Sequence, residues 1–167
     1  MEIGIQSAGA PDAQVNMDGK RPTPIVRDAH ALLVRGIEEL ERNHFAEAVG
    51  LLRQSVELDE DSFYAQLALG IALTKTLEIP QAEHALETAI RLEPRSFWAH
   101  LRMAQLHQRV GAPIRCQQEL QIALDVAESS EERKIARDLL EAEKSRNPKR
   151  VWRPDFTRLR GRKNRET

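Results

Sequence analysis

The sequence predicts an all-α protein, an α-solenoid in which antiparallel helix pairs stack side by side. The composition supports this class, because 31% charged and only 4% aromatic residues favour surface-rich helices over β-sheets. From Ala29 onward the apolar residues recur at helical spacing. Similar segments also return every 34 positions, which indicates an array of repeats: SVELDEDS at 55–62, AIRLEPRS at 89–96 and ALDVAESS at 123–130.

Two regions outside the repeats differ from them in composition. The chain of 167 residues, 41% of them apolar, is long enough for one domain with a hydrophobic core. Residues 1–28 hold three prolines and show no sustained period, which predicts a flexible N-terminal arm. Residues 147–167 carry eight Lys/Arg against two Asp/Glu and form a basic C-terminal tail of net charge +6. Residues 28–146 carry a net charge of −7.

The same sequence predicts a cytoplasmic protein without a transmembrane segment. Glu2 stands where a signal peptide would carry a basic residue, and no continuous apolar stretch follows it. Charged residues interrupt every stretch before it reaches the roughly 20 apolar residues that a membrane-spanning helix needs. The single cysteine, Cys116, excludes an intrachain disulfide and fits a reducing compartment.

The second repeat, residues 63–96, carries the clearest motif. Two of its small residues would let the paired helices approach closely, and its proline would end the second helix. The motif residues are Leu69, Gly70, Leu73, Ala82, Leu86, Ala89 and Pro94. This pattern resembles the tetratricopeptide repeat, and residues 29–62 and 97–130 match it less fully in the same register. The resemblance implies a right-handed superhelix of three helix pairs.

A seventh helix, at residues 131–146, is predicted to cap the array. Ser129 stands three residues before Glu132, the spacing of a capping box that begins a helix. The apolar residues that follow form one stripe, and the opposite face is charged. Such a helix would seal the stacking face of the last repeat, which would otherwise be exposed.

The resemblance also implies a concave groove, lined by the first helix of each pair, that binds a peptide or helix of a partner protein. We therefore expect a protein-protein interaction adaptor or scaffold. The groove is apolar at one end and basic at the other. Some of its residues could instead pack between the helices. The candidate residues are Leu33, Val34, Ile37, Tyr64, Leu67, Ile71, Lys75, Trp98, Leu101, Arg102, Gln105 and Arg109.

One known use of such a groove is excluded by the sequence. Clamping the acidic tail of a heat-shock chaperone takes Lys, Asn and Arg at particular positions of the three repeats. Of these positions only Arg102 carries the required type of residue. The others hold Leu33, Ile37, Ala68 and Trp98.

Other functions are predicted by the tail or by the repeats themselves. The tail interleaves cations with two aromatic residues, a composition that suits an RNA- or ribosome-associated protein or a segment on an anionic surface. The alternative is a solvated tail, or one that docks on the acidic domain of its own chain. A secretion-type chaperone or a self-assembling scaffold would also use three repeats. The tail residues concerned are Arg150, Trp152, Arg153, Phe156, Arg158 and Arg160.

The sequence predicts neither enzymatic activity nor a cofactor. It lacks the GxSxG, P-loop, GxGxxG and HExxH motifs. His100 and His107 lie seven residues apart, on one face of a helix, at packing positions of the third repeat. Two ligands do not make a metal site, so we interpret both as structural histidines. Cys116 occupies a small-residue packing position.

Overall fold

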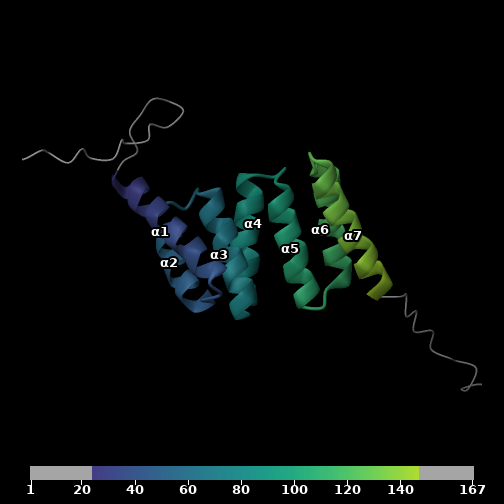
Figure 1. Cartoon of the computed structure of the whole chain (residues 1–167), viewed down its shortest axis with the longest axis horizontal. Coiled ribbons are helices and arrows are strands. Elements are labelled where there is room, and N and C mark those ends of the chain that lie inside the picture. The colour runs from purple at the N-terminus through teal and green to yellow at the C-terminus, as the bar shows by residue number, and fades with distance from the viewer. Residues whose placement is uncertain (1–23, 147–167) are drawn as a thin grey trace, which may run out of the picture.

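The computed structural model describes residues 24–146, and these residues form seven α-helices joined by short turns (Figure 1). No helix in this part of the chain is both long and apolar enough to span a lipid bilayer. The helices follow one another along the long axis of the molecule, from α1 at one end to α7 at the other. They are α1 (Pro24–Glu41), α2 (Phe45–Leu58), α3 (Phe63–Thr76), α4 (Ile79–Leu92), α5 (Phe97–Arg109), α6 (Pro113–Val126) and α7 (Ser130–Arg146).

The helices pair as the 34-residue period predicts. The second helices of the three pairs begin at Phe45, Ile79 and Pro113, which are 34 residues apart, and α3 and α5 begin at Phe63 and Phe97. The pairs α1 with α2, α3 with α4 and α5 with α6 make the most extensive contacts, and α7 packs on α6. The predicted all-α solenoid is thereby confirmed.

The first helix begins earlier than the sequence analysis predicted. Helix α1 starts at Pro24, so the boundary drawn after residue 28 falls inside it. The prolines of this region argued for a flexible arm. However, proline is well tolerated in the first turn of a helix, because its backbone nitrogen needs no partner there and its φ is already helical. The rest of the predicted arm, residues 1–23, lies outside the described residues.

Glycine lets the helices of the first two pairs approach closely. A Cβ atom added at Gly36 would lie 2.6 Å from Cγ of Leu52, and one at Gly70 would lie 2.6 Å from Cγ of Leu86. Both leucines are fully buried. Each glycine therefore leaves the space into which the leucine of the partner helix packs. Ala104 occupies the equivalent position of the third pair.

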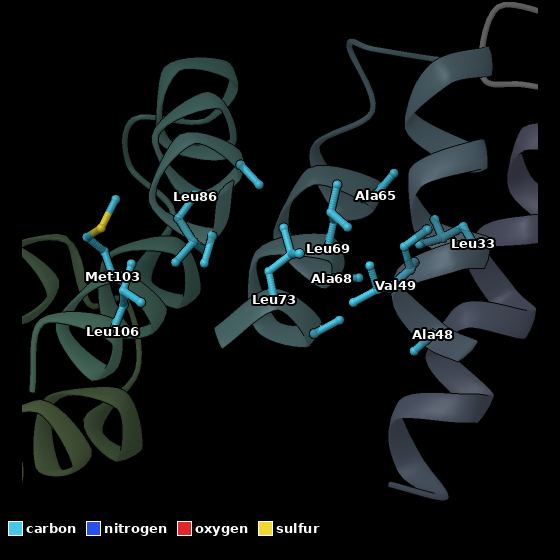
Figure 2. Packing of buried hydrophobic residues seen from close by; sticks show 14 residues of the cluster. Leu33, Ala48, Val49, Ala65, Ala68, Leu69, Leu73, Leu86, Met103 and Leu106 are labelled. Carbon is cyan, nitrogen blue, oxygen red and sulfur yellow. The ribbon is translucent and has the colours of Figure 1, made fainter. Parts of the chain in front are cut away.

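The hydrophobic core runs continuously from pair to pair. Figure 2 shows Leu69 and Leu73 of α3 between Val49 of α2 on one side and Leu86 of α4 on the other. A buried hydrogen bond adds to this packing, because the Ser55 hydroxyl donates to the Ala29 carbonyl at 2.8 Å and joins α2 to α1. A second cluster of buried residues joins α5, α6 and α7.

Serine side chains cap several helices. The hydroxyl oxygens of Ser62 and Ser96 accept hydrogen bonds from backbone N–H groups in the first turns of α3 and α5, each at 3.4 Å. The predicted capping box of α7 is confirmed. The Glu132 N–H donates to the Ser129 hydroxyl at 3.0 Å, and the Glu132 carboxylate accepts from the Ser129 N–H at 3.2 Å.

The N-terminal edge of the stack is polar. Arg35 of α1 is exposed, whereas the residues one and two repeats further on, Leu69 and Met103, are buried. Glu39 is partly exposed, whereas Leu73, one repeat further on, is buried. The Glu39 carboxylate pairs with Arg42 and His44. A further repeat stacked on this edge would bury these charges at a large cost. Arg35 and Glu39 thus make this edge a polar end of the stack.

The close packing of leucine on glycine predicts how substitutions at the glycines change stability. Replacing Gly70 with Ala should lower the free energy of unfolding by about 1–2 kcal/mol, because the overpacking at Leu86 outweighs the gain in helix propensity. Urea unfolding followed by circular dichroism measures this change. Gly50 of α2 is the matched control, since a Cβ there has no atom within 4 Å. Replacing Gly50 with Ala should raise stability by about 0.5–1 kcal/mol, and equal effects at both glycines would contradict the packing argument.

The turns between paired helices share one backbone conformation. In each turn the residue at the same position of the repeat adopts a positive φ, of 63° at Asn43, 67° at Leu77 and 72° at Gly111. Asn and Gly tolerate this left-handed region, but it costs other residues roughly 1–2 kcal/mol. Leu77 is also largely exposed, so little packing offsets the cost.

We therefore expect Leu77→Asn to raise the free energy of unfolding by about 0.5–1 kcal/mol, because asparagine relieves the backbone strain. The reverse exchange, Asn43→Leu, should lower it by a similar amount. Chemical denaturation of the two variants beside the wild type checks both signs. A loss of stability in Leu77→Asn would show that the leucine side chain contributes packing that outweighs its strain.

Candidate functional site

The first helices of the pairs form the inner face of the stack. Helix α3 contacts both α1 and α5, and these contacts are more extensive than any between successive second helices. The stack therefore curves toward α1, α3 and α5, as repeat arrays do when one layer of helices packs more closely than the other. We call the surface along these helices the inner groove.

The structure divides the predicted groove residues into exposed and buried groups. Val34, Ile37, Tyr64 and Trp98 are exposed large apolar or aromatic residues. Lys75 and Arg109 are also exposed. The remaining candidates on the surface are partly exposed: Leu67, Ile71, Arg102 and Gln105.

Leu33 and Leu101 belong to the core. They are only 8% and 3% exposed, and each packs in a cluster of buried residues between helices. The prediction that they line the groove is wrong for these two residues. Both side chains pack between the helices, an alternative that the sequence analysis states for some of the groove residues.

Two aromatic rings are displayed at one edge of the inner groove. Tyr64 and Trp98 are the second residues of α3 and α5, one repeat apart. Each lies edge-to-face against the buried phenylalanine before it, with ring centroids 5.2 Å apart in both the Phe63–Tyr64 and the Phe97–Trp98 pair. The buried ring orients the exposed one, so little side-chain entropy is lost when a ligand packs on it.

A polar pocket of about 470 Å3 lies at the other edge of the inner groove, between α3, α5 and α7. It brings together the three predicted cations, Lys75, Arg102 and Arg109, and adds Arg146 from the last turn of α7. We call it the cationic pocket. Its complete lining is Ile71, Thr74, Lys75, Arg102, Gln105, Gln108, Arg109 and Arg146.

The cations of this pocket are held in place mainly without carboxylates. The Arg102 guanidinium donates to Oε1 of Gln105 at 2.9 Å and lies 6.0 Å from the centre of the Trp98 ring. Burial lowers the pKa of Arg102, because desolvation disfavours the charged form. Among the described residues, no carboxylate lies within ion-pair distance of Lys75, Arg102 or Arg109.

The capping helix contributes an acidic group beside the pocket. Glu143 of α7 is 4% exposed, and its carboxylate accepts a hydrogen bond from the Gln108 amide at 3.0 Å. Its Oε2 also lies 3.7 Å from the Arg146 guanidinium. The sequence analysis assigns α7 only a capping role, so it does not include Glu143 and Arg146 among the site residues. The signal in the sequence was that α7 continues the row of inner helices.

The tail predicted to contact nucleic acid lies outside the described residues. This applies to all six of its candidate residues: Arg150, Trp152, Arg153, Phe156, Arg158 and Arg160. The N-terminal arm is a further candidate occupant of the groove of its own chain, and residues 1–23 of it also lie outside the described residues.

The two histidines of α5 are buried structural residues, as predicted. His100 and His107 are each 6% exposed. His100 Nδ1 lies 2.8 Å from the Glu119 carboxylate of α6, and its Nε2 lies 3.1 Å from the Pro94 carbonyl. A neutral imidazole has one N–H and can satisfy only one of these acceptors, whereas the protonated ring donates to both. The Glu119 hydrogen bond raises the pKa of His100, and burial opposes this effect.

Cys116 is a buried packing residue in the contact between α5 and α6. Burial raises its pKa to about 11, so the thiol remains protonated and a poor nucleophile near neutral pH. Residues 24–146 contain no group of three or more His, Cys, Asp or Glu arranged to hold a metal ion. The described surface thus offers contacts for a ligand and no evident reactive centre.

The His100 contacts predict a pH-dependent stability. Because its pKa is raised on folding, the contribution is complete below the unfolded pKa of about 6.5 and is lost as pH rises through the folded pKa. We expect the free energy of unfolding to fall between about pH 6 and about pH 9, and to fall less in Glu119→Gln. Urea unfolding at both pH values measures the difference. His84→Gln, at an exposed position, should keep the wild-type dependence, and an unchanged slope in Glu119→Gln would contradict this account.

No family model matches the chain, and no curated protein is similar to it in sequence. Solved structures are similar to it in fold. The first TPR of Spaghetti (RPAP3), bound to the HSP90 peptide SRMEEVD, has a TM-score of 0.65 at 14% identity, over 72% of this chain and 94% of that one. The yeast Sti1 TPR2B domain, in a complex with pHsp70, has a TM-score of 0.65 at 21% identity, over 72% and 98%.

A bacterial structure is similar to the same extent. The Yersinia enterocolitica type III secretion chaperone SycD, in complex with a peptide of the translocator YopD, has a TM-score of 0.64 at 16% identity, over 71% of this chain and 93% of that one. At these identities the similarity concerns the fold.

Proposed function

We propose that this chain, whose fold is that of tetratricopeptide-repeat domains, is an adaptor that binds a peptide segment of a partner protein in its inner groove. The partner segment is extended or helical and carries apolar side chains. It lies across α1, α3 and α5, with one end over the cationic pocket.

The observation that carries this proposal is the arrangement of exposed side chains on the inner helices. Apolar residues that stay exposed on one face mark interaction surfaces when they gather together with polar groups at their edge. Val34 and Ile37 of α1 and the oriented rings of Tyr64 and Trp98 are of this kind. The cations without carboxylate partners lie at the far edge of the same surface.

The structural neighbours support a role of this type. Two of them were solved with bound peptides, one from HSP90 and one from the translocator YopD. A secretion-type chaperone remains an alternative, because it would use the same groove for a different partner. The proposed role requires no catalysis, which fits the buried, protonated thiol of Cys116.

The proposal predicts that partner binding depends on the inner helices. We expect the double variant Ile37→Asp/Trp98→Ala to lose partner protein by at least about tenfold, because two exposed anchors are removed without disturbing the core. A tagged pull-down from native lysate with quantitative mass spectrometry measures the loss. Circular dichroism checks that the variant is folded.

The matched control lies on the second helix of the last pair. Ile122 of α6 is 39% exposed and Ile37 is 38% exposed, so Ile122→Asp makes the same chemical change outside the inner groove. It should retain the partner at the wild-type level. If Ile122→Asp loses the partner and the groove variant keeps it, the binding surface is elsewhere and the proposal fails.

A further inference from the structure

We infer that the cationic pocket between α3, α5 and α7 binds a doubly charged anionic group of the partner peptide, either a phosphorylated side chain or two neighbouring carboxylates. This inference rests on the proposed function, because it assigns the chemistry that one end of the groove recognises. It concerns a pocket that includes the capping helix as well as the second and third repeats.

The charge of the pocket is unbalanced. Four cationic side chains and no carboxylate of the described residues line it, and the Glu143 carboxylate beside it is already engaged by Gln108 and Arg146. The net charge of residues 28–146 is negative, whereas the charge of the side chains that line this pocket is positive. Mutual repulsion of like charges around one cavity is relieved when an anion enters it.

Arg102 is positioned for recognition of an oxyanion. Its guanidinium is partly buried, and one of its nitrogens is fixed by the Gln105 amide oxygen. The planar fork therefore has a defined orientation and still carries free N–H groups. Such a fork matches the oxygens of a carboxylate or a phosphate in a bidentate manner, and desolvation strengthens the charge-assisted hydrogen bonds.

The number of cations and the size of the pocket favour more than one negative charge. Lys75 and Arg109 occupy the same place in successive repeats, and Arg102 and Arg146 line the same pocket. A single carboxylate satisfies one guanidinium fork and leaves the other cations unpaired. A phosphate group or a pair of carboxylates reaches several of them at once within a pocket of about 470 Å3.

The charge along the inner groove also gives the peptide a direction. Glu41 of α1 stands where α3 and α5 carry Lys75 and Arg109. An anionic group is therefore repelled at the first repeat and attracted at the third. The doubly charged end of the peptide lies over α5 and α7, and its apolar part lies over α1.

The test uses the full chain and three small probes: phosphoserine, the dipeptide Glu-Glu and acetate. The Nε–H resonances of Arg102 and Arg109 are followed by NMR, since they report on this pocket and not on the basic tail. We expect phosphoserine, Glu-Glu or both to shift them saturably and more tightly than acetate. Binding of phosphoserine alone identifies a phosphate site, and binding of Glu-Glu alone identifies a paired-carboxylate site.

Charge-matched variants provide the control. Lys75→Gln/Arg102→Gln should weaken binding of the effective probe by at least about tenfold, followed at Arg109, because charge-assisted hydrogen bonds are lost. Arg53→Gln/Arg115→Gln removes the same charge from exposed residues paired with Glu78 and Glu83, and should leave binding unchanged. Equal weakening in both variants, binding of acetate as tight as that of the other probes, or no shift in the wild type would each overturn the inference.

The two proposals fail in different ways. If the probes bind as expected but the groove variant still captures its partner, the anion site stands and the peptide-binding role of the apolar surface falls. If the groove variant loses its partner and no probe shifts the arginine resonances, the adaptor role stands and the pocket does not recognise anions.

Discussion

The close contact between the two helices of each pair is the constraint on which the rest of the structure depends. In the first two pairs a leucine of the second helix packs on a glycine of the first, Leu52 on Gly36 and Leu86 on Gly70, and in the third pair the small residue is Ala104. This contact fixes the distance between the two helices, and its repetition every 34 residues sets the same geometry from pair to pair. The inner helices then lie side by side, and their outward positions form one surface.

The ends of the array decide which surface remains available to a ligand. At the N-terminal edge, charged Arg35 and Glu39 replace the apolar residues that would support another repeat. At the other end, α7 covers the last pair and turns Arg146 toward the inner face. With both edges polar, the exposed apolar side chains of the inner helices are the natural docking surface, and α7 becomes part of the site as well as a cap.

The 34-residue period predicts most of the fold from the sequence. Phe63 and Phe97, for example, begin helices at the predicted repeat boundaries. It could not separate Leu33 and Leu101, which are buried, from Ile37, which is exposed, because a leucine on an inner helix can face either its partner helix or the groove. The sequence predicts three of the four cations of the cationic pocket. Lys75, Arg102 and Arg109 lie on repeats with a known register, whereas Arg146 enters through the packing of α7, which no repeat motif specifies.

The central claim is that the inner face of the array holds the partner, and site-specific photocrosslinking tests it most directly. A benzophenone amino acid would replace Trp98 on the inner face in one protein and Ile122 on α6 in another, both at exposed positions. The account predicts a crosslinked partner from position 98, attached through a segment that carries the anionic group, and none from position 122. A partner crosslinked from position 122 and absent from position 98 would contradict it.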